Sequence, residues 1–236
     1  MSDLEILFED NHLIALNKRP ADIVQGDKSG DVPLSERLKD YLKARYGKPG
    51  RVFIGVPHRL DRPASGVVLF ARTSKALQRL AAQFRQGEVR KLYWALVQSR
   101  PPKEQDTLVH QLLRNASQNK SYVCQGPRPG SRESRLSYRL LLSLERYHLL
   151  EVELATGRHH QIRAQLAHIG CPIKGDLKYG ARRSNPGGGI HLHSRELSLL
   201  HPVKGTPLTI LADPPPADAL WTEVMRRLGE EQGKKA

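Results

Sequence analysis

The 236-residue sequence carries 38 lysines and arginines against 24 aspartates and glutamates, and its formal net charge of +14 favours a polyanionic partner, either nucleic acid or an anionic membrane surface. A hydrophobic content of 39% excludes wholesale disorder, and Cys124 and Cys171 are too isolated to form a disulfide framework. No apolar run approaches the roughly 20 residues that cross a bilayer, so we expect a soluble cytoplasmic protein with a nucleic-acid partner and no membrane partner.

The first 90 residues predict three strands and two helices. Apolar residues three and four positions apart predict a helix from about Leu34 to a stop at Gly47. Thr73 can cap a second helix that ends at Gly87. Short apolar runs predict the strands, which are ILFED, Leu13 to Leu16, and Val67 to Ala71.

The rest of the chain predicts strands separated by single helices, which is typical of an α+β fold with a largely antiparallel sheet. One helix begins near His159 and ends at Gly170, and the last runs from Ala217 to Leu228. Residues 101–134 are polar and irregular, which predicts either an RNA-facing insertion or a mobile loop. The predicted strands are Tyr93 to Val97, His148 to Leu154, Leu192 to Leu199, and Leu208 to Leu211.

The segment HRLDRPASG, residues 58–66, places one carboxylate in a basic loop that enters a buried strand. Asp61 is flanked by Arg59 and Arg62, and the loop holds no second acid. Cations nearby keep a carboxylate ionised even where water is excluded. Such a group can be a nucleophile, a base or half of a structural ion pair. The pattern alone favours the structural ion pair.

A second segment, TGRHHQIR at residues 156–163, gathers cationic and polar donors at the start of a predicted helix. Helix N-termini already favour anions, so the segment is either a cap with a solvated face or a site for an acidic group. A third segment, RKLYWA at residues 90–95, places Tyr93 after a basic pair. By itself Tyr93 is better explained as core filling than as a platform for a stacked base.

Taken together, these segments resemble the RluA family of RNA pseudouridine synthases. The order and separation of the motifs also agree with the family, and the resemblance extends from about Leu4 to Pro214. Four ordered matches are far more specific than any one of them. The matching segments are HRLDRPASGVVLFA (58–71), KLYWALV (91–97), TGRHHQIRAQLAHIGCPIKGDLKYG (156–180) and IHLHSRELSLLHP (190–202).

The resemblance implies a fold, a reaction and a partner. The fold is the α+β pseudouridine-synthase fold, a largely antiparallel mixed sheet flanked by helices and loops with a central active-site cleft. Residues 1–216 would form the catalytic domain, without the S4 domain of some relatives, and residues 217–236 a C-terminal helix and charged tail. The reaction isomerises uridines in structured rRNA or tRNA, with no cofactor, no metal and a monomeric enzyme as the default.

The resemblance also assigns roles to individual residues. Asp61 matches the catalytic aspartate, and Arg163 matches the basic residue that pairs with it. Tyr93 matches the tyrosine that packs against the target uracil and is implicated in proton removal. Arg59 matches the arginine that fills the space left by a flipped-out base. Further RNA-binding residues are expected at Arg62, Arg158, His160 and Gln161.

The sequence has four rival interpretations, and each of them requires a particular pattern of residues. The four histidines 159, 160, 191 and 193 could suggest zinc, but closed zinc sites usually recruit four cysteines or histidines at tighter spacing. A non-catalytic RNA-binding protein would lack the acid at position 61. A DNA-binding protein would need a groove-reading motif, and a hydrolytic nucleosidase a second carboxylate or an acidic metal cluster. The motifs do not encode which RNA is modified.

Overall fold

The computed structural model describes residues 4–27, 30–47 and 49–233, and the chain divides into two compact units. The first unit takes the chain up to Lys91 together with Ser194–Ala212. The second takes Leu92–His193 and the chain from Asp213 onwards. Among the described residues, none of the helices has the length and apolar character needed to cross a bilayer.

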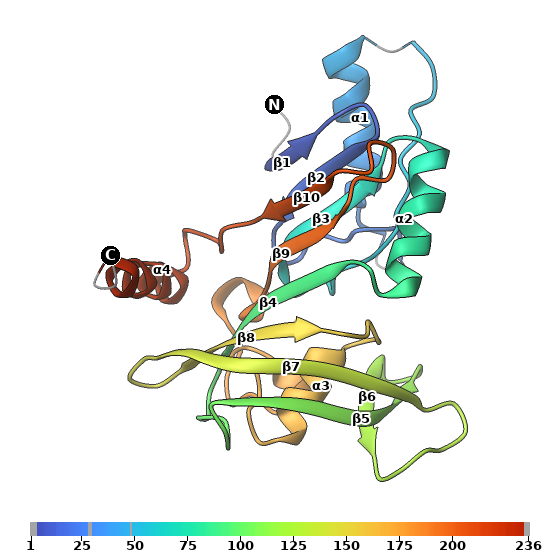
Figure 1. Ribbon diagram of the computed structural model, residues 1–236. Helices are drawn as coiled ribbons and strands as arrows, with labels where there is room; N and C mark the ends of the chain where they lie inside the picture. Colours follow the sequence, from blue (N-terminus) through green and yellow to red (C-terminus); the bar gives the residue numbers. More distant parts are fainter. Residues whose placement is uncertain (1–3, 28–29, 48, 234–236) are drawn as a thin grey trace. The chain divides into compact units, whose positions relative to one another are not determined.

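The first unit is a sheet with strand order β1-β2-β3-β9, in which β10 pairs with β9 (Figure 1). The β1–β2, β2–β3 and β9–β10 pairs are antiparallel. Two helices accompany this sheet. The elements are β1 (Ile6–Glu9), β2 (Leu13–Lys18), α1 (Leu34–Tyr46), β3 (Ser65–Ala71), α2 (Ser74–Gln86), β9 (Leu192–Leu200, which begins in the second unit) and β10 (Pro207–Leu211).

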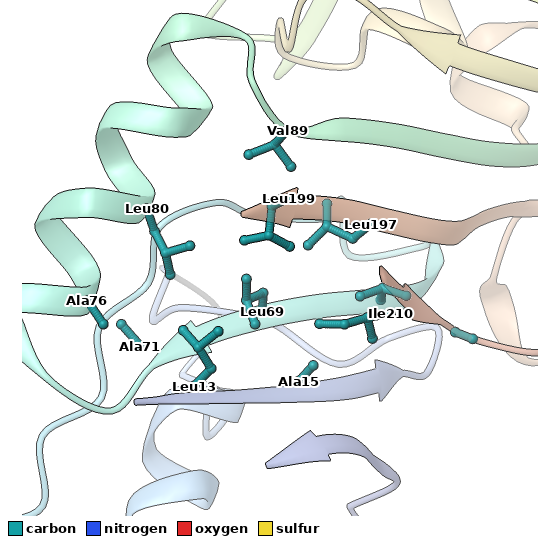
Figure 2. Close-up of a cluster of buried hydrophobic side chains, with 12 residues drawn as sticks. Leu13, Ala15, Leu69, Ala71, Ala76, Leu80, Val89, Leu197, Leu199 and Ile210 are labelled. Atoms are coloured by element: carbon teal, nitrogen blue, oxygen red, sulfur yellow. The ribbon is translucent and has the colours of Figure 1, made fainter. Parts of the chain in front are cut away.

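The central strands β2 and β3 are buried on both faces. Successive side chains of a strand point in opposite directions, so each strand contributes to two apolar clusters. One set of alternate residues packs with α2; Figure 2 shows Leu13 and Leu69 near Leu80 of that helix. The other set, which includes Ile14 and Phe70, packs with the leucines of α1. This two-sided burial explains why both strands read as continuous apolar runs in the sequence.

The second unit is an antiparallel sheet with strand order β4-β8-β7-β5-β6. Helix α3 packs on it through Ala164, which lies in one buried apolar cluster with Leu112 and Tyr179. Helix α4 adds Trp221 and Val224 to a separate apolar cluster. The elements are β4 (Arg90–Val97, which begins in the first unit), β5 (Gln105–Asn115), β6 (Lys120–Cys124), β7 (Arg132–Ser143), β8 (His148–Leu154), α3 (Gln161–His168), the 3-10 turns η1 (Leu177–Tyr179) and η2 (Pro186–Gly188), and α4 (Ala219–Gly233).

The prediction of an irregular segment at residues 101–134 is wrong. Most of it forms β5, β6 and the start of β7. Strand β5 pairs with β6 along one edge and with β7 along the other. Only one face of these strands is covered, so polar residues such as Thr107 and Arg135 alternate with buried Leu108 and Leu136. The many polar side chains of the open face concealed the period of two in the sequence.

Most other predicted elements are confirmed. Thr73 caps α2 by accepting a hydrogen bond from the Ala76 amide at 3.2 Å, and Gly87 ends that helix in the left-handed conformation. Helix α4 begins at Ala219 and continues to Gly233, beyond the predicted end. The last residues of the predicted charged tail, 234–236, lie outside the described residues.

Candidate active site

The loop that carries Asp61 is attached at its entrance by His58, and both lie in the first unit. The His58 Nε2 atom accepts a hydrogen bond from the Leu69 amide of β3 at 2.9 Å. The His58 ring stacks on Phe84 of α2, with centroids 4.7 Å apart. Burial, with a smaller contribution from the charge of Lys91, lowers the pKa of His58 to about 4. A neutral imidazole that accepts through Nε2 therefore holds the start of the loop to the sheet.

The exit of the loop is fixed by a turn and by a glycine. The Ala64 amide donates to the Asp61 carbonyl at 3.0 Å, which closes the turn. Gly66 follows with φ of +111°, and a Cβ placed there would lie 2.3 Å from the Ser194 carbonyl oxygen. A side chain at this position would be strained by the backbone angle and would also collide with the facing strand. The SG pair of the motif thus allows β3 to pass close to β9.

A buried lysine lies beneath the same loop. Lys18, at the end of β2, is 1% exposed, and its Nζ donates to the carbonyl oxygens of Arg19 at 2.9 Å, Arg62 at 2.9 Å and Ala64 at 2.7 Å. Burial lowers the pKa of Lys18 to about 7, against the opposing pull of nearby carboxylates that include Asp61. Lys18 was not predicted from the sequence as a site residue. The one local sign of its role is that a charged residue closes the apolar strand LIALNK.

The two arginines next to Asp61 are exposed, whereas Asp61 itself is half-buried. Arg62 Nη2 lies 2.6 Å from Asp31 Oδ2 in an exposed ion pair. Exposed pairs contribute little to stability. Because Arg59 and Arg62 are exposed, their side chains are accessible to a phosphate or a base of RNA.

In the second unit, Arg163 of α3 is 4% exposed and forms a bidentate ion pair with Asp176. Its Nε and Nη2 donate to the two carboxylate oxygens at 2.7 and 2.8 Å. The Tyr179 ring lies 5.0 Å from the guanidinium carbon. Tyr93 is 9% exposed on β4, where it is opposite Val152 of β8. Asp176 and Tyr179 were not predicted as site residues, although both lie in the motif KGDLKYG.

The start of α3 is organised by the side chain of Gln161, which is 3% exposed. Its Oε1 accepts from the Thr156 hydroxyl at 2.8 Å and from the Arg158 amide at 2.9 Å. Its Nε2 donates to the Arg135 carbonyl at 3.0 Å. The side chain therefore closes the turn in front of the helix, while Arg158 remains at the surface.

His160 occupies the N-cap position of α3 in the left-handed conformation, with φ of 53°. Burial and the charge of Arg163 lower the pKa of His160 to about 2, so the ring is neutral. Its Nδ1 lies 3.0 Å from the Tyr179 hydroxyl. Direct RNA contacts by His160 and Gln161 remain a prediction, and the bonds that the structure gives both side chains are internal.

The structure thus gathers the expected residues into two groups. Arg59, Asp61 and Arg62 share one loop of the first unit, and the remaining site residues lie in the second unit. Pairing of Asp61 with Arg163 remains a prediction. Among the described residues, no group of three or more histidines, cysteines, aspartates or glutamates is arranged to hold a metal ion. His191 instead contacts Asn185 at 2.8 Å and Asp218 at 3.1 Å.

Comparison with known sequences identifies the family. Residues 12–168, which include all the predicted site residues, match the family described as RNA pseudouridylate synthase. The chain belongs to this family. Its α+β pseudouridine-synthase fold is also seen in the human protein RNA Pseudouridylate Synthase Domain Containing 4, with a TM-score of 0.77 at 23% identity over 95% of this chain and 92% of that one.

Several curated proteins resemble this chain along most of its length. An uncharacterised RNA pseudouridine synthase of Synechocystis is 34% identical over 90% of this chain and 66% of that protein. The tRNA pseudouridine synthase C of Salmonella typhi is 32% identical over 96% of this chain and 90% of that protein. The ribosomal large subunit pseudouridine synthase C of Vibrio cholerae is 32% identical over 88% of this chain and 64% of that protein. The chain therefore spans just under two thirds of the Synechocystis and Vibrio relatives.

Proposed function

We propose that this chain converts particular uridines of structured tRNA or rRNA to pseudouridine, with Asp61 as the catalytic residue. Membership of the family supports the reaction, and relatives named for tRNA and for the large ribosomal subunit support the substrate class. The net charge of +14 favours sequence-independent contacts with RNA phosphates. The observation that carries the assignment is the fixed position of the Asp61 loop. His58 holds its start, Gly66 allows the close packing at its end, and Lys18 donates to its Ala64 carbonyl.

The reaction needs a single carboxylate because no atom of water enters the product. The bond from N1 of uracil to the ribose breaks, the base turns, and C5 bonds to the same ribose carbon. The C5 proton is lost and N1 gains a proton, so substrate and product are isomers. A glycosidase usually needs two carboxylates because one must activate water or assist the leaving group. Asp61 acts either by attacking the sugar as a nucleophile or by removing a sugar proton as a base.

The uridine must leave its stack before the carboxylate can reach its sugar. Extruding a base costs a few kcal/mol, and protein groups that replace the lost stacking offset that cost. Arg59 is exposed two residues before Asp61, so its side chain is available to fill the vacated space. Tyr93 is assigned the contact with the extruded uracil, and Arg163 the ion pair with Asp61.

Substitution of Asp61 by asparagine tests the proposal. The variant keeps the size of the side chain and removes its charge, so we expect RNA affinity and melting temperature to stay near wild-type values. Pseudouridine formation should stop. Release of tritium from uridine labelled at C5 measures the reaction, and filter binding measures affinity, with tRNA and rRNA transcripts tested separately.

The matched control is Asp40→Asn, which removes an exposed carboxylate of α1 in the same unit. Wild-type activity is expected for the control. Tritium release by Asp61→Asn at the wild-type rate would show that another group carries out the chemistry. Activity on only one of the two RNA classes would assign the substrate.

A further inference from the structure

The guanidinium group of Arg163 is oriented by a short turn that follows α3. Asp176 accepts from its Nε and Nη2 at 2.7 and 2.8 Å, and the two side chains are 5% and 1% exposed. Tyr179, three residues further along, presents its ring 5.0 Å from the guanidinium carbon. A bidentate pair fixes the plane of the guanidinium as well as its distance. Asp176 and Tyr179 together therefore set how Arg163 points.

The turn is itself held in place. The Tyr179 hydroxyl accepts from the Ser121 amide of β6 at 2.8 Å and lies 3.0 Å from His160 Nδ1. Just before Asp176, Gly175 has φ of +89°, and a Cβ there would lie 2.5 Å from the Asn185 side chain. The turn is thus hydrogen-bonded to β6 and lies within hydrogen-bond distance of His160 at the start of α3. A side chain at position 175 would clash with Asn185. It supports Asp176 as a fixed part of the second unit.

We propose that Asp176 is a positioning residue, which orients the Arg163 guanidinium for its part in the reaction at Asp61. The assignment rests on the proposed function, because that function gives Arg163 its task. Asp176 occupies the edge formed by Nε and Nη2 and so directs the Nη1 end of Arg163 the other way. Apolar residues of similar volume often stabilise a protein as well as a buried ion pair does. Stability alone therefore gives little reason for a carboxylate at position 176.

A double-mutant cycle tests this role. The variants are Asp176→Asn, Arg163→Met and the two combined, and the measured quantity is the single-turnover rate of tritium release. A displacement of about 1 Å in an active site can lower a rate about 10²-fold. We expect Asp176→Asn to lose about that much with RNA affinity unchanged within about twofold. In the Arg163→Met background the same substitution should have no further effect, because its target is gone.

The combined variant separates positioning from stability. Each single variant breaks the buried Arg163–Asp176 ion pair and keeps one of its two charges, so both should melt at a lower temperature than the wild type. The combined variant removes both charges and should melt above either single variant. Its rate should nevertheless stay as low as that of Arg163→Met. Asp176→Glu, which keeps the negative charge, should recover part of the rate lost in Asp176→Asn.

Asp106→Asn is the matched control, because its carboxylate pairs with Lys103 at 3.1 Å in the same unit and is partly open to solvent. It should retain the wild-type rate. The nitrogen-15 resonance of Arg163 Nε gives a readout without RNA. Its proton should exchange slowly in the wild type and rapidly in Asp176→Asn.

Three outcomes would overturn the proposal. They are a wild-type rate for folded Asp176→Asn, independent and additive losses in the cycle, and a rate that recovers with the melting temperature in the combined variant. Asp61→Asn is assayed in parallel. If it is fully active, the proposed function fails; if it is inactive while the cycle is additive, only the role of Asp176 fails.

Discussion

Replacing Lys18 with methionine tests whether the buried ammonium anchors the loop that carries Asp61. Methionine keeps the apolar stem and removes the donor from the carbonyls of Arg19, Arg62 and Ala64. Only the bond to Ala64 is fully buried, and an orphaned buried acceptor costs about 1–3 kcal/mol. At the part-buried carbonyls of Arg19 and Arg62, water can replace Lys18 as the donor. We expect the free energy of unfolding to fall by about 2 kcal/mol, which lowers Tm by roughly 4–8 °C.

Thermal unfolding followed by circular dichroism measures this change, and tritium release measures its effect on the reaction. The rate should fall by no more than about tenfold, since His58 and Gly66 still hold the two ends of the loop. The matched control is Lys39→Met, on a partly exposed lysine of α1 that pairs with Glu36. The stability of this variant should stay within about 0.5 kcal/mol of wild type. If Lys18→Met melts together with the control, Lys18 is not an anchor.

The pH dependence of the same two proteins checks the ionisation of Lys18. Burial lowers its pKa to about 7 in the folded chain, whereas a lysine in the unfolded chain has a pKa of about 10.4. Between these values the unfolded chain binds more protons, so the stability of the wild type should rise with pH. Lys18→Met should lack this rise. Parallel stability curves for the two proteins from pH 7 to 10 would refute the assignment.

Three further changes probe the loop and the RNA-binding surface. Gly66→Ala should destabilise the protein by several kcal/mol through backbone strain and a clash with the facing strand, whereas Gly87→Ala meets no atom within 4 Å and should cost about 1 kcal/mol in urea unfolding. Arg59→Ala should slow the modification of structured RNA more than that of a short single strand; equal losses would remove its role in base flipping. Replacing exposed Arg128 and Arg132 with glutamine should weaken RNA binding and reduce its salt dependence, and an unchanged slope would place RNA elsewhere.

The sequence predicted the elements whose signals are local. Strands β2 and β3 are apolar on both faces, so each reads as a continuous hydrophobic run. Helix α2 has its start and end encoded by Thr73 and Gly87. The motif around Asp61 likewise predicted a polar loop that enters a buried strand, because loop and strand differ sharply in composition within nine residues.

What the sequence did not predict depends on partners distant along the chain. Lys18 and the Ala64 carbonyl are 46 residues apart, and Arg163 and Asp176 are 13 apart across a turn. Charged residues are almost never fully buried unless they are paired, so composition assigns both cations to the surface until the fold supplies their acceptors. The same ambiguity left Asp61 open to a structural or a catalytic interpretation.

The two buried cations have different kinds of acceptor, and the difference indicates what each one does. Lys18 donates to three backbone carbonyls of the loop region, through a compact ammonium group on a flexible stem. Arg163 is held by a carboxylate in a planar bidentate pair, which fixes its orientation. An anchor needs only a strong donor at the right depth, whereas a group that takes part in a reaction must also point correctly. We therefore expect Arg163→Lys, which keeps the charge and loses the planar fork, to impair tritium release more than folding. If the loss of stability in Arg163→Lys fully accounts for its loss of rate, Arg163 is a structural cation like Lys18.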